Sequence, residues 1–230
     1  MDYVIPTSIA SVPVAGSDAH FPVNRIYCVG RNYADHAREM GHSGREAPFF
    51  FMKPANAVLP LAPAMVGQMH YPSHTADLQH EAELVVAIGT GGSHIAAAEA
   101  MQHVWGYAVG IDMTRRDLQA EAKKFGRPWC VAKGFDESAP IGPIHQAQDC
   151  KGIEKAGIRL RVNGIERQCG TTDMMIWNIA ETIEVLSGYF ALQPGDLIYT
   201  GTPAGVAAVR KGDLIEAEVD GLGMIAFHLI

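Results

Sequence analysis

The sequence contains no apolar run close to the roughly 20 residues that a membrane-spanning helix requires. Its four cysteines are scattered and form no C-x-x-C pair, which is typical of reduced thiols and argues against a disulfide framework or a zinc site. The amino terminus shows no basic segment followed by an apolar block, so no signal peptide is expected. Together these absences predict a cytoplasmic protein.

An excess of positive charge is also missing. The 230 residues include 18 Lys and Arg against 25 Asp and Glu, which gives a net charge of −7. This balance argues against a nucleic acid or an anionic membrane as partner, so an anionic substrate would need individual Arg and Lys residues or a metal ion. The G-x-G-x-x-G, P-loop, G-x-S-x-G and H-E-x-x-H motifs are absent, which excludes the commonest nucleotide-binding, serine-hydrolase and zinc-protease sites.

What is present predicts one folded domain. A chain of 230 residues with 48% hydrophobic residues can bury a sizeable core. Residues 1–24, rich in Pro, Ser and Ala, are expected to form an extended lead-in to the folded domain over residues 25–230. Short apolar runs bounded by Gly and Pro outnumber helical segments, so we predict an α+β fold with a large mixed sheet.

The local patterns give the expected elements. A two-residue hairpin turn is predicted at Asn163-Gly164. Helices are predicted at 31–41, at 93–103 with Ser93 as N-cap, at 114–125 with Gly126 as stop, and at 178–190. Strands are predicted at 25–30, 49–53, 84–88, 104–111, 129–135, 197–203, 214–219 and 224–230.

Two acidic residues precede the most apolar of these strands. Because residues i and i+2 of a strand share a face, Glu81 and Glu83 are expected to project together. Carboxylates side by side suit a hard divalent cation such as Mg²⁺ or Mn²⁺, although a solvated acidic strand end fits the same pattern. Asp112 follows another predicted strand and precedes a helix, where it is a third candidate for an oxygen ligand or an ordinary helix cap.

Other side chains suit catalysis or anion binding. His36 and Glu39 share a face of the predicted helix, so Glu39 could poise the imidazole as a general base, or the two could form a plain surface contact. Lys133 lies in an apolar run and must find an anion there. The turn at Gly201-Thr202 could offer N–H groups and a hydroxyl to a carboxylate, or be an ordinary tight turn.

The order of six short motifs along the chain is more specific than any one of them. This succession resembles the fumarylacetoacetate hydrolase family over residues 25–230, and within the family the bacterial fumarylpyruvate hydrolases and acylpyruvases. The motifs are Tyr27-Cys-Val-Gly-Arg-Asn-Tyr-Ala-Asp-His36, Phe51-Met-Lys-Pro54, His80-Glu-Ala-Glu-Leu84, Gly110-Ile-Asp-Met-Thr-Arg-Arg-Asp-Leu-Gln119, Lys133-Gly-Phe135 and Thr200-Gly-Thr-Pro203.

The resemblance implies the fold of that family's C-terminal domain, an α+β fold whose large mixed sheet is rolled into a sandwich-like core with a few helices. It also implies a divalent Mg²⁺ or Mn²⁺ cofactor and a small 2,4-dioxo acid as substrate. The positions that match the family's metal ligands are Glu81, Glu83 and Asp112. His36, oriented by Glu39, would deprotonate a water that attacks the C4 carbonyl. The tetrahedral intermediate would then collapse and release a pyruvate enolate.

Further positions carried over from the family would surround the substrate. Lys133 matches the active-site lysine that stabilises oxyanion or enolate charge, and Gln119 matches a residue that positions the substrate or water. Arg31 and Arg116 are candidates for holding substrate carboxylates, and Thr202 for contacting the pyruvate carboxylate. The helix that carries the His–Glu dyad would belong to a mobile lid.

The expected activity is hydrolysis of a carbon–carbon bond in an acylpyruvate, with fumarylpyruvate cleaved to fumarate and pyruvate in aromatic (gentisate) degradation as the preferred reaction. An isomerase or decarboxylase acting on 2-oxo diacids, of the oxaloacetate or 2-hydroxyhepta-2,4-diene-1,7-dioate type, would use the same metal without a nucleophilic water. Two alternatives of other classes are a non-catalytic module that binds dicarboxylates or metal, and a structural protein with solvated carboxylates. The family also implies a homodimer.

Overall fold

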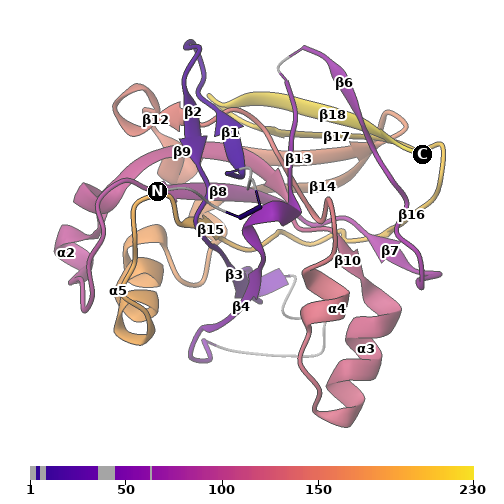
Figure 1. The fold of residues 1–230 in the computed structure, drawn as a ribbon, viewed down its shortest axis with the longest axis horizontal. Helices are drawn as coiled ribbons and strands as arrows, with labels where there is room; N and C mark the ends of the chain where they lie inside the picture. The colour runs from indigo at the N-terminus through magenta and orange to yellow at the C-terminus, as the bar shows by residue number, and fades with distance from the viewer. Residues whose placement is uncertain (1–3, 6–8, 36–44, 63) are drawn as a thin grey trace.

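The computed structural model describes residues 4–5, 9–35, 45–62 and 64–230, and most of their strands form two curved sheets (Figure 1). The larger sheet has the order β4-β3-β15-β8-β9-β11-β5, with β12 paired to β9 off this path. Its strands are β3 (Ile26–Gly30), β4 (Phe49–Lys53), β5 (Val58–Pro60), β8 (Ala82–Ile88), β9 (Val104–Ile111), β11 (Ala139–Ile141), β12 (His145–Gln146) and β15 (Leu197–Tyr199).

The smaller sheet has the order β14-β13-β17-β18-β6. Each sheet is mixed, because β3–β15 and β5–β11 are parallel in the larger and β6–β18 in the smaller, whereas their other pairs are antiparallel. The α+β fold with a large mixed sheet is therefore confirmed. The strands of the smaller sheet are β6 (Val66–Met69), β13 (Gly157–Val162), β14 (Ile165–Thr171), β17 (Leu214–Val219) and β18 (Gly223–Leu229), and three short strands, β7 (Leu78–Gln79), β10 (Thr114–Arg115) and β16 (Ala208–Val209), pair separately.

Strand β8 lies at the centre of the core and is buried along its whole length. Leu84 and Val86 belong to the cluster that joins the two sheets, together with apolar side chains of β13 and β18. Val85 and Ala87 belong to a second cluster on the other face. Since alternate residues of a strand point to opposite faces, Glu83 shares the face of Val85 and Ala87.

Part of the amino-terminal segment covers that second face. Strands β1 (Ser11–Pro13) and β2 (His20–Pro22) form an antiparallel hairpin, although this stretch was expected to be an extended lead-in. Val12 is fully buried and Phe21 is nearly so, both within the second cluster. Apolar side chains on one side of this hairpin therefore pack against the larger sheet and cover one of its faces.

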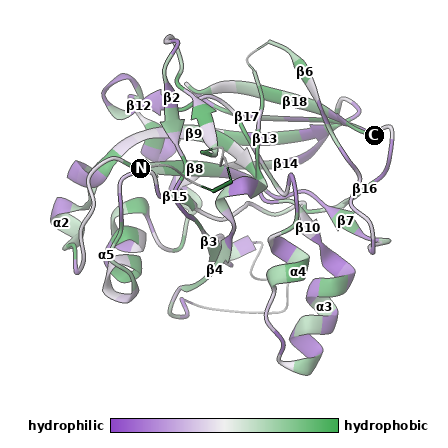
Figure 2. Ribbon diagram, in the orientation of Figure 1, coloured by the Kyte–Doolittle hydropathy of each residue, from purple (hydrophilic) through white to green (hydrophobic). Residues whose placement is uncertain are grey.

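The helices lie at two ends of the molecule, with α2 beside α5 at one end and α3 beside α4 at the other (Figure 1). The predicted helix at 114–125 is α3 (Arg116–Phe125), which ends at Gly126 in the left-handed conformation with φ 61°. Figure 2 shows hydrophilic segments alternating with hydrophobic ones along α3, as expected for a helix with one face on the domain. The predicted helix at 178–190 is α5 (Ile179–Tyr189), which begins with a capping box between Asn178 and Glu181.

Three expected elements differ from the structure. The strand expected at 197–203 is only β15 (Leu197–Tyr199), and the backbone after it is irregular. The helix expected at 93–103 is only α2 (Ala97–Ala100), which follows Ala96 rather than Ser93 and continues as a 3₁₀ turn. The strand expected at 129–135 is instead the short helix α4 (Cys130–Lys133), whose N–H groups bond locally to Trp129 and Cys130. An apolar run this short fits one helical turn as well as a strand, so its periodicity does not distinguish the two. The 3₁₀ turns are η1 (Ala55–Ala57), η2 (Met101–His103), η3 (Ala147–Asp149), η4 (Ile153–Lys155) and η5 (Thr172–Met174).

The hairpin at Asn163-Gly164 is confirmed between β13 and β14, with φ values of 53° and 76° that suit a two-residue turn. Most of the helix predicted at 31–41 falls outside the described residues. Within the described part of the chain, no helix is long and apolar enough to cross a membrane.

Candidate active site

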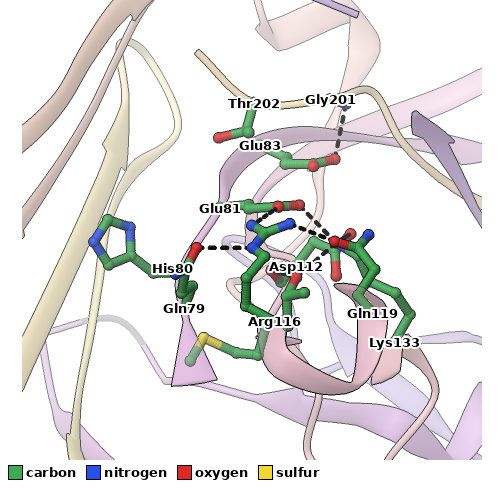
Figure 3. A network of polar contacts seen from close by, with 12 residues as sticks. Gln79, His80, Glu81, Glu83, Asp112, Arg116, Gln119, Lys133, Gly201 and Thr202 are labelled. Carbon is green, nitrogen blue, oxygen red and sulfur yellow. Dashed lines mark hydrogen bonds and ion pairs between the residues drawn. The ribbon is translucent and has the colours of Figure 1, made fainter. Parts of the chain in front are cut away.

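The pairing of β8 with β9 brings three carboxylates together. Glu83 lies opposite Gly110, and the backbone N–H of Asp112 donates to the carbonyl of Glu81 at 2.8 Å. Glu81, Glu83 and Asp112 each offer an oxygen within 4.8 Å of the others, and their exposed fractions are 6%, 2% and 1% (Figure 3). The alternative of solvated acidic side chains is therefore wrong for these residues, because they are buried.

Cationic side chains compensate two of the three carboxylates. The Lys133 ammonium lies 2.7 Å from Oε2 of Glu81 and 2.8 Å from Oδ2 of Asp112. Lys53 lies 2.8 Å from the other Asp112 oxygen, and Arg116 pairs with Glu81. Burial alone would lower the pKa of Lys133, but the Asp112 and Glu81 carboxylates raise it above its ordinary value. Lys133 is therefore a protonated hydrogen-bond donor at neutral pH and not a general base.

Glu83 differs from the other two carboxylates. Its Oε2 accepts from the Gly201 N–H at 2.8 Å, and among the described residues no Lys, Arg or His lies within salt-bridge distance of it. Burial, followed by the charges of Asp112 and Glu81, raises the pKa of Glu83 well above its ordinary value. A buried carboxylate crowded by two others fits a divalent cation bound among them, and three carboxylates are a donor set that Mg²⁺ and Mn²⁺ prefer. The cluster can therefore hold such an ion.

Gln168, from β14 of the smaller sheet, is a residue that the sequence did not reveal. Its Oε1 accepts from the backbone N–H of Ala82 at 3.0 Å, and its Nε2 donates to the Pro203 carbonyl at 2.8 Å. These two backbone partners fix which end of the amide is oxygen. Because Nε2 also contacts Oγ1 of Thr202 at 2.7 Å, the Thr202 oxygen accepts there and its own proton is available to another acceptor. Gln168 thereby ties the acidic strand to the Thr200–Pro203 turn.

The same amide fixes the state of His80. Oε1 of Gln168 can only accept, so Nδ1 of His80 at 2.9 Å carries the proton and Nε2 carries the lone pair. Burial lowers the pKa of His80 to about 4, even though the bond to Gln168 opposes this shift. His80 is therefore neutral at neutral pH and serves as a buried support directly before Glu81. The sequence did not indicate that His80 and Gln168 interact, because they are 88 positions apart and meet only in the folded chain.

Lys53 was also missed, but here the sequence carried a signal. It ends the aromatic strand β4 and is 1% exposed. Its ammonium donates to the carbonyl of Met113 at 3.3 Å and to that of Lys133, besides pairing with Asp112. The argument that a lysine in an apolar run must find an anion applies to Lys53 as well as to Lys133.

Three further predicted residues line a pocket above the carboxylates. Arg31, Gln119 and Thr202 all face it. Gln119 is 3% exposed, and its Oε1 accepts from Nη1 of Arg116 at 2.7 Å. The Arg116 guanidinium also donates to Gln79, so this cation is bound into the carboxylate cluster. His36 and Glu39 lie outside the described residues, so their role stays a prediction.

Comparison with known proteins places this pocket in a family. The model for the C-terminal domain of fumarylacetoacetate (FAA) hydrolase matches residues 25–230. The chain belongs to the fumarylacetoacetate hydrolase family. The family's C-terminal-domain fold is thus confirmed for nearly the whole chain.

Several members of the fumarylacetoacetate hydrolase family are close relatives. The structure of fumarylpyruvate hydrolase from Pseudomonas aeruginosa in complex with Mn²⁺ and pyruvate is 50% identical, with a TM-score of 0.98 over 100% of this chain and 99% of that one. The mitochondrial oxaloacetate tautomerase of Rattus norvegicus is 42% identical over 89% of this chain and 90% of its own. A 2-hydroxyhepta-2,4-diene-1,7-dioate isomerase from Mycobacterium marinum is 31% identical, with a TM-score of 0.77 over 90% of this chain and 75% of that one. Enzymes of the family therefore include both hydrolases and isomerases.

Proposed function

We propose that this protein is a metal-dependent hydrolase that cleaves the C3–C4 bond of an acylpyruvate, with fumarylpyruvate giving fumarate and pyruvate as the reaction. The observation that carries this proposal is the cluster of three buried carboxylates with the protonated Lys133 at the floor of a pocket. The 50% identity to a fumarylpyruvate hydrolase over the full length of both chains supports the choice of substrate.

Glu81, Glu83 and Asp112 would hold Mg²⁺ or Mn²⁺, and three protein ligands leave positions for water and substrate oxygens. When bound, the ion supplies a Lewis acid that polarises the 2-oxo group and stabilises negative charge on the pyruvate portion. The relative from Pseudomonas aeruginosa contains Mn²⁺ together with pyruvate, which supports this assignment.

The chain's own residues would then position and stabilise the substrate. The three N–H groups of Lys133 bond Glu81, Asp112 and Thr114, so its positive charge would stabilise the developing oxyanion or enolate. The Thr202 proton, left available by Gln168, would bond the pyruvate carboxylate. Gln119 would orient substrate or water from the pocket wall. The proposed base is His36 with Glu39, which would activate the water.

A second candidate function is tautomerisation or isomerisation of a 2-oxo diacid. The oxaloacetate tautomerase at 42% identity favours it, and the same carboxylates and Lys133 can stabilise an enolate without a nucleophilic water. Decarboxylation of such a diacid requires the same stabilisation. Hydrolysis needs a base that activates water, whereas tautomerisation, isomerisation and decarboxylation do not.

Assays with fumarylpyruvate, acetylpyruvate and oxaloacetate, each with Mn²⁺ and with a chelator, test the proposal. We expect Mn²⁺-dependent release of pyruvate and fumarate from fumarylpyruvate, and His36→Ala should remove this activity. Enol-to-keto conversion of oxaloacetate without cleavage of any acylpyruvate would instead establish the second candidate. Metal binding without turnover of any of the three would favour the non-catalytic module.

The homodimer implied by the family, a small dioxo acid as the partner, and the cytoplasm as location belong to the same proposal. Light scattering on the purified protein would measure the mass of the particle against that of one 24.8 kDa chain. A monomer at micromolar concentration would contradict the dimer.

A further inference from the structure

The mouth of the pocket contains residues that the proposed chemistry does not use. Phe51 and Trp129 lie with ring centroids 5.5 Å apart, and Phe49 packs edge-on against Trp129 at 5.6 Å. The Lys133 ammonium lies 5.0 Å from the Phe51 ring, and the Lys123 ammonium lies 5.2 Å from the Trp129 ring. Aromatic rings therefore form a continuous wall from the cation at the floor of the pocket to a second cation at its mouth.

Among the described residues, Lys123 differs from the cations at the floor in having no anionic partner. Within the described ranges, no carboxylate lies within salt-bridge distance of its ammonium, whereas Lys53, Lys133 and Arg116 all pair with the carboxylate cluster. Desolvation, followed by the charges of Arg116 and Arg31, lowers the pKa of Lys123 below its ordinary value. In the described part of the chain, Lys123 is thus an unpaired positive charge at the mouth, in a protein whose net charge is −7.

Arg31 lies at the same mouth in an uncommon backbone conformation. Its φ is 56°, the left-handed region that non-glycine residues rarely adopt and that clusters at functional sites. This conformation places the guanidinium 4.8 Å from the centre of the Phe49 ring, on the pocket lining. Its one recorded anionic partner among the described residues is Glu46 at 3.4 Å, and the Glu46 side chain is 60% exposed. Such a pair is weak and can yield to a bound anion.

We propose that Lys123, with Arg31, binds a second carboxylate at the far end of the substrate's acyl group. The first carboxylate would lie at the floor beside Thr202, and the flat aromatic wall would contact the carbon chain between the two. This assignment rests on the proposed function and narrows its substrate class to acylpyruvates whose acyl group is a planar, unsaturated acid. A substrate without the distal carboxylate would leave the charge at the mouth uncompensated.

The test compares two substrates and two lysines. Lys123→Met keeps the length of the side chain and removes its charge, and Lys124→Met is the matched control, since Lys124 lies over the exposed Phe125 and not on the pocket lining. The ratio of kcat/KM for fumarylpyruvate to that for acetylpyruvate should fall about tenfold to a hundredfold in Lys123→Met, mainly through KM. Lys124→Met should leave this ratio as it is, and Lys123→Arg should restore most of it.

An unchanged ratio in Lys123→Met would overturn the assignment of the distal carboxylate while leaving acylpyruvate hydrolysis intact. A wild-type protein that cleaves acetylpyruvate but not fumarylpyruvate would overturn it too. If the wild type cleaves neither substrate, the proposed function fails. The two lysine variants are then compared by the Kd values of the two acylpyruvates in the presence of Mn²⁺. A loss of affinity in Lys123→Met that is confined to fumarylpyruvate would then still support the subsite, and equal losses for both would overturn it.

Discussion

The floor of the pocket contains three carboxylates and two lysines that are almost wholly buried, together with the mostly buried Arg116, whereas the mouth contains Lys123 and Arg31 in contact with solvent. At the floor, fixed ion pairs leave only Glu83 without a cationic partner in the described structure. At the mouth, both charges lie on aromatic rings, and among the described residues Arg31 has only the exposed Glu46 as partner and Lys123 has none. Charges at the floor are therefore coupled to folding and metal binding, and charges at the mouth can vary with little effect on the fold.

Removal of the Glu83 charge should separate activity from stability most strongly. Glu83→Gln keeps an oxygen for the Gly201 N–H, but it removes a metal ligand, so kcat should fall by about a thousandfold or more. Because the folded-state pKa of Glu83 is raised, its ionised form destabilises the metal-free fold above its unfolded pKa of about 4.5. Near pH 7 the metal-free variant should therefore melt higher than the wild type, and added Mn²⁺ should no longer raise its Tm. Exposed Glu166→Gln is the control, and a metal-free melting temperature below that of the wild type would contradict this account.

Lys133→Met should reveal how strongly the floor depends on paired charges. The substitution leaves Glu81 and Asp112 short of a buried cation, which typically costs about 3–5 kcal/mol of unfolding free energy. Urea unfolding of the metal-free protein would measure this loss, with exposed Lys151→Met as control. A loss of unfolding free energy no larger than that of the control would show that the ion pairs at the floor contribute as little to stability as exposed charges do.

His80 should make the support beneath the floor sensitive to acid. Its pKa is about 4 in the folded state against 6.5 in the unfolded state, so between these values the unfolded chain binds more protons. Stability should therefore be fully present above pH 6.5 and decrease as pH falls toward about 4, by up to about 3 kcal/mol. Unfolding free energies at a series of pH values, compared with those of His80→Gln, would isolate this contribution. Equal slopes in the two proteins would contradict it.

Gln168→Leu should weaken metal binding at the floor of the pocket, although Gln168 is not one of the proposed metal ligands. The variant loses the bonds to Ala82, Thr202 and Pro203 without touching a metal ligand, so Mn²⁺ affinity should fall about tenfold to a hundredfold. A Mn²⁺ titration would measure the effect, with exposed Gln148→Leu as control. If KM for acetylpyruvate and Mn²⁺ affinity both stay at the wild-type values, Gln168 has only a structural role.

Salt should produce the smallest effect and should act on the mouth alone. Raising NaCl from about 0.05 M to about 0.5 M screens exposed charges, so KM for fumarylpyruvate should rise several-fold. The rise should shrink in Lys123→Met and be smaller for acetylpyruvate. A rise that is equal for both substrates would assign the salt effect to the floor.

The sequence predicted what local patterns and motif order encode. The β-branched run after Glu83, the Asn163-Gly164 turn and the helix that ends at Gly126 were each placed correctly, because adjacent residues determine them. The three carboxylates were picked out from strand periodicity and the position of Asp112, and the structure brings them together.

What the sequence could not give depends on contacts between distant segments. Lys133 lies at the end of a helix and not in a strand. Backbone hydrogen bonds to the Trp129 carbonyl form that helix, and the apolar run is too short for its periodicity to distinguish a helix from a strand. Gln168 reaches the acidic strand only because the smaller sheet packs on the larger. At the mouth, Arg31 was a candidate but Lys123 was missed, because Lys123 resembles any lysine on the polar side of a surface helix until its neighbour Trp129 is known.

Gly30 limits how the width of the entrance can be altered. A β-carbon at this position would lie 2.0 Å from the tip of the Phe49 ring, which Arg31 and Trp129 contact from other directions. Any larger residue at position 30 would therefore push that ring and the guanidinium on it out of place. Attempts to adapt the enzyme to bulkier acyl chains should consequently leave Gly30 alone and trim Phe49 instead, since Phe49 also lines the pocket.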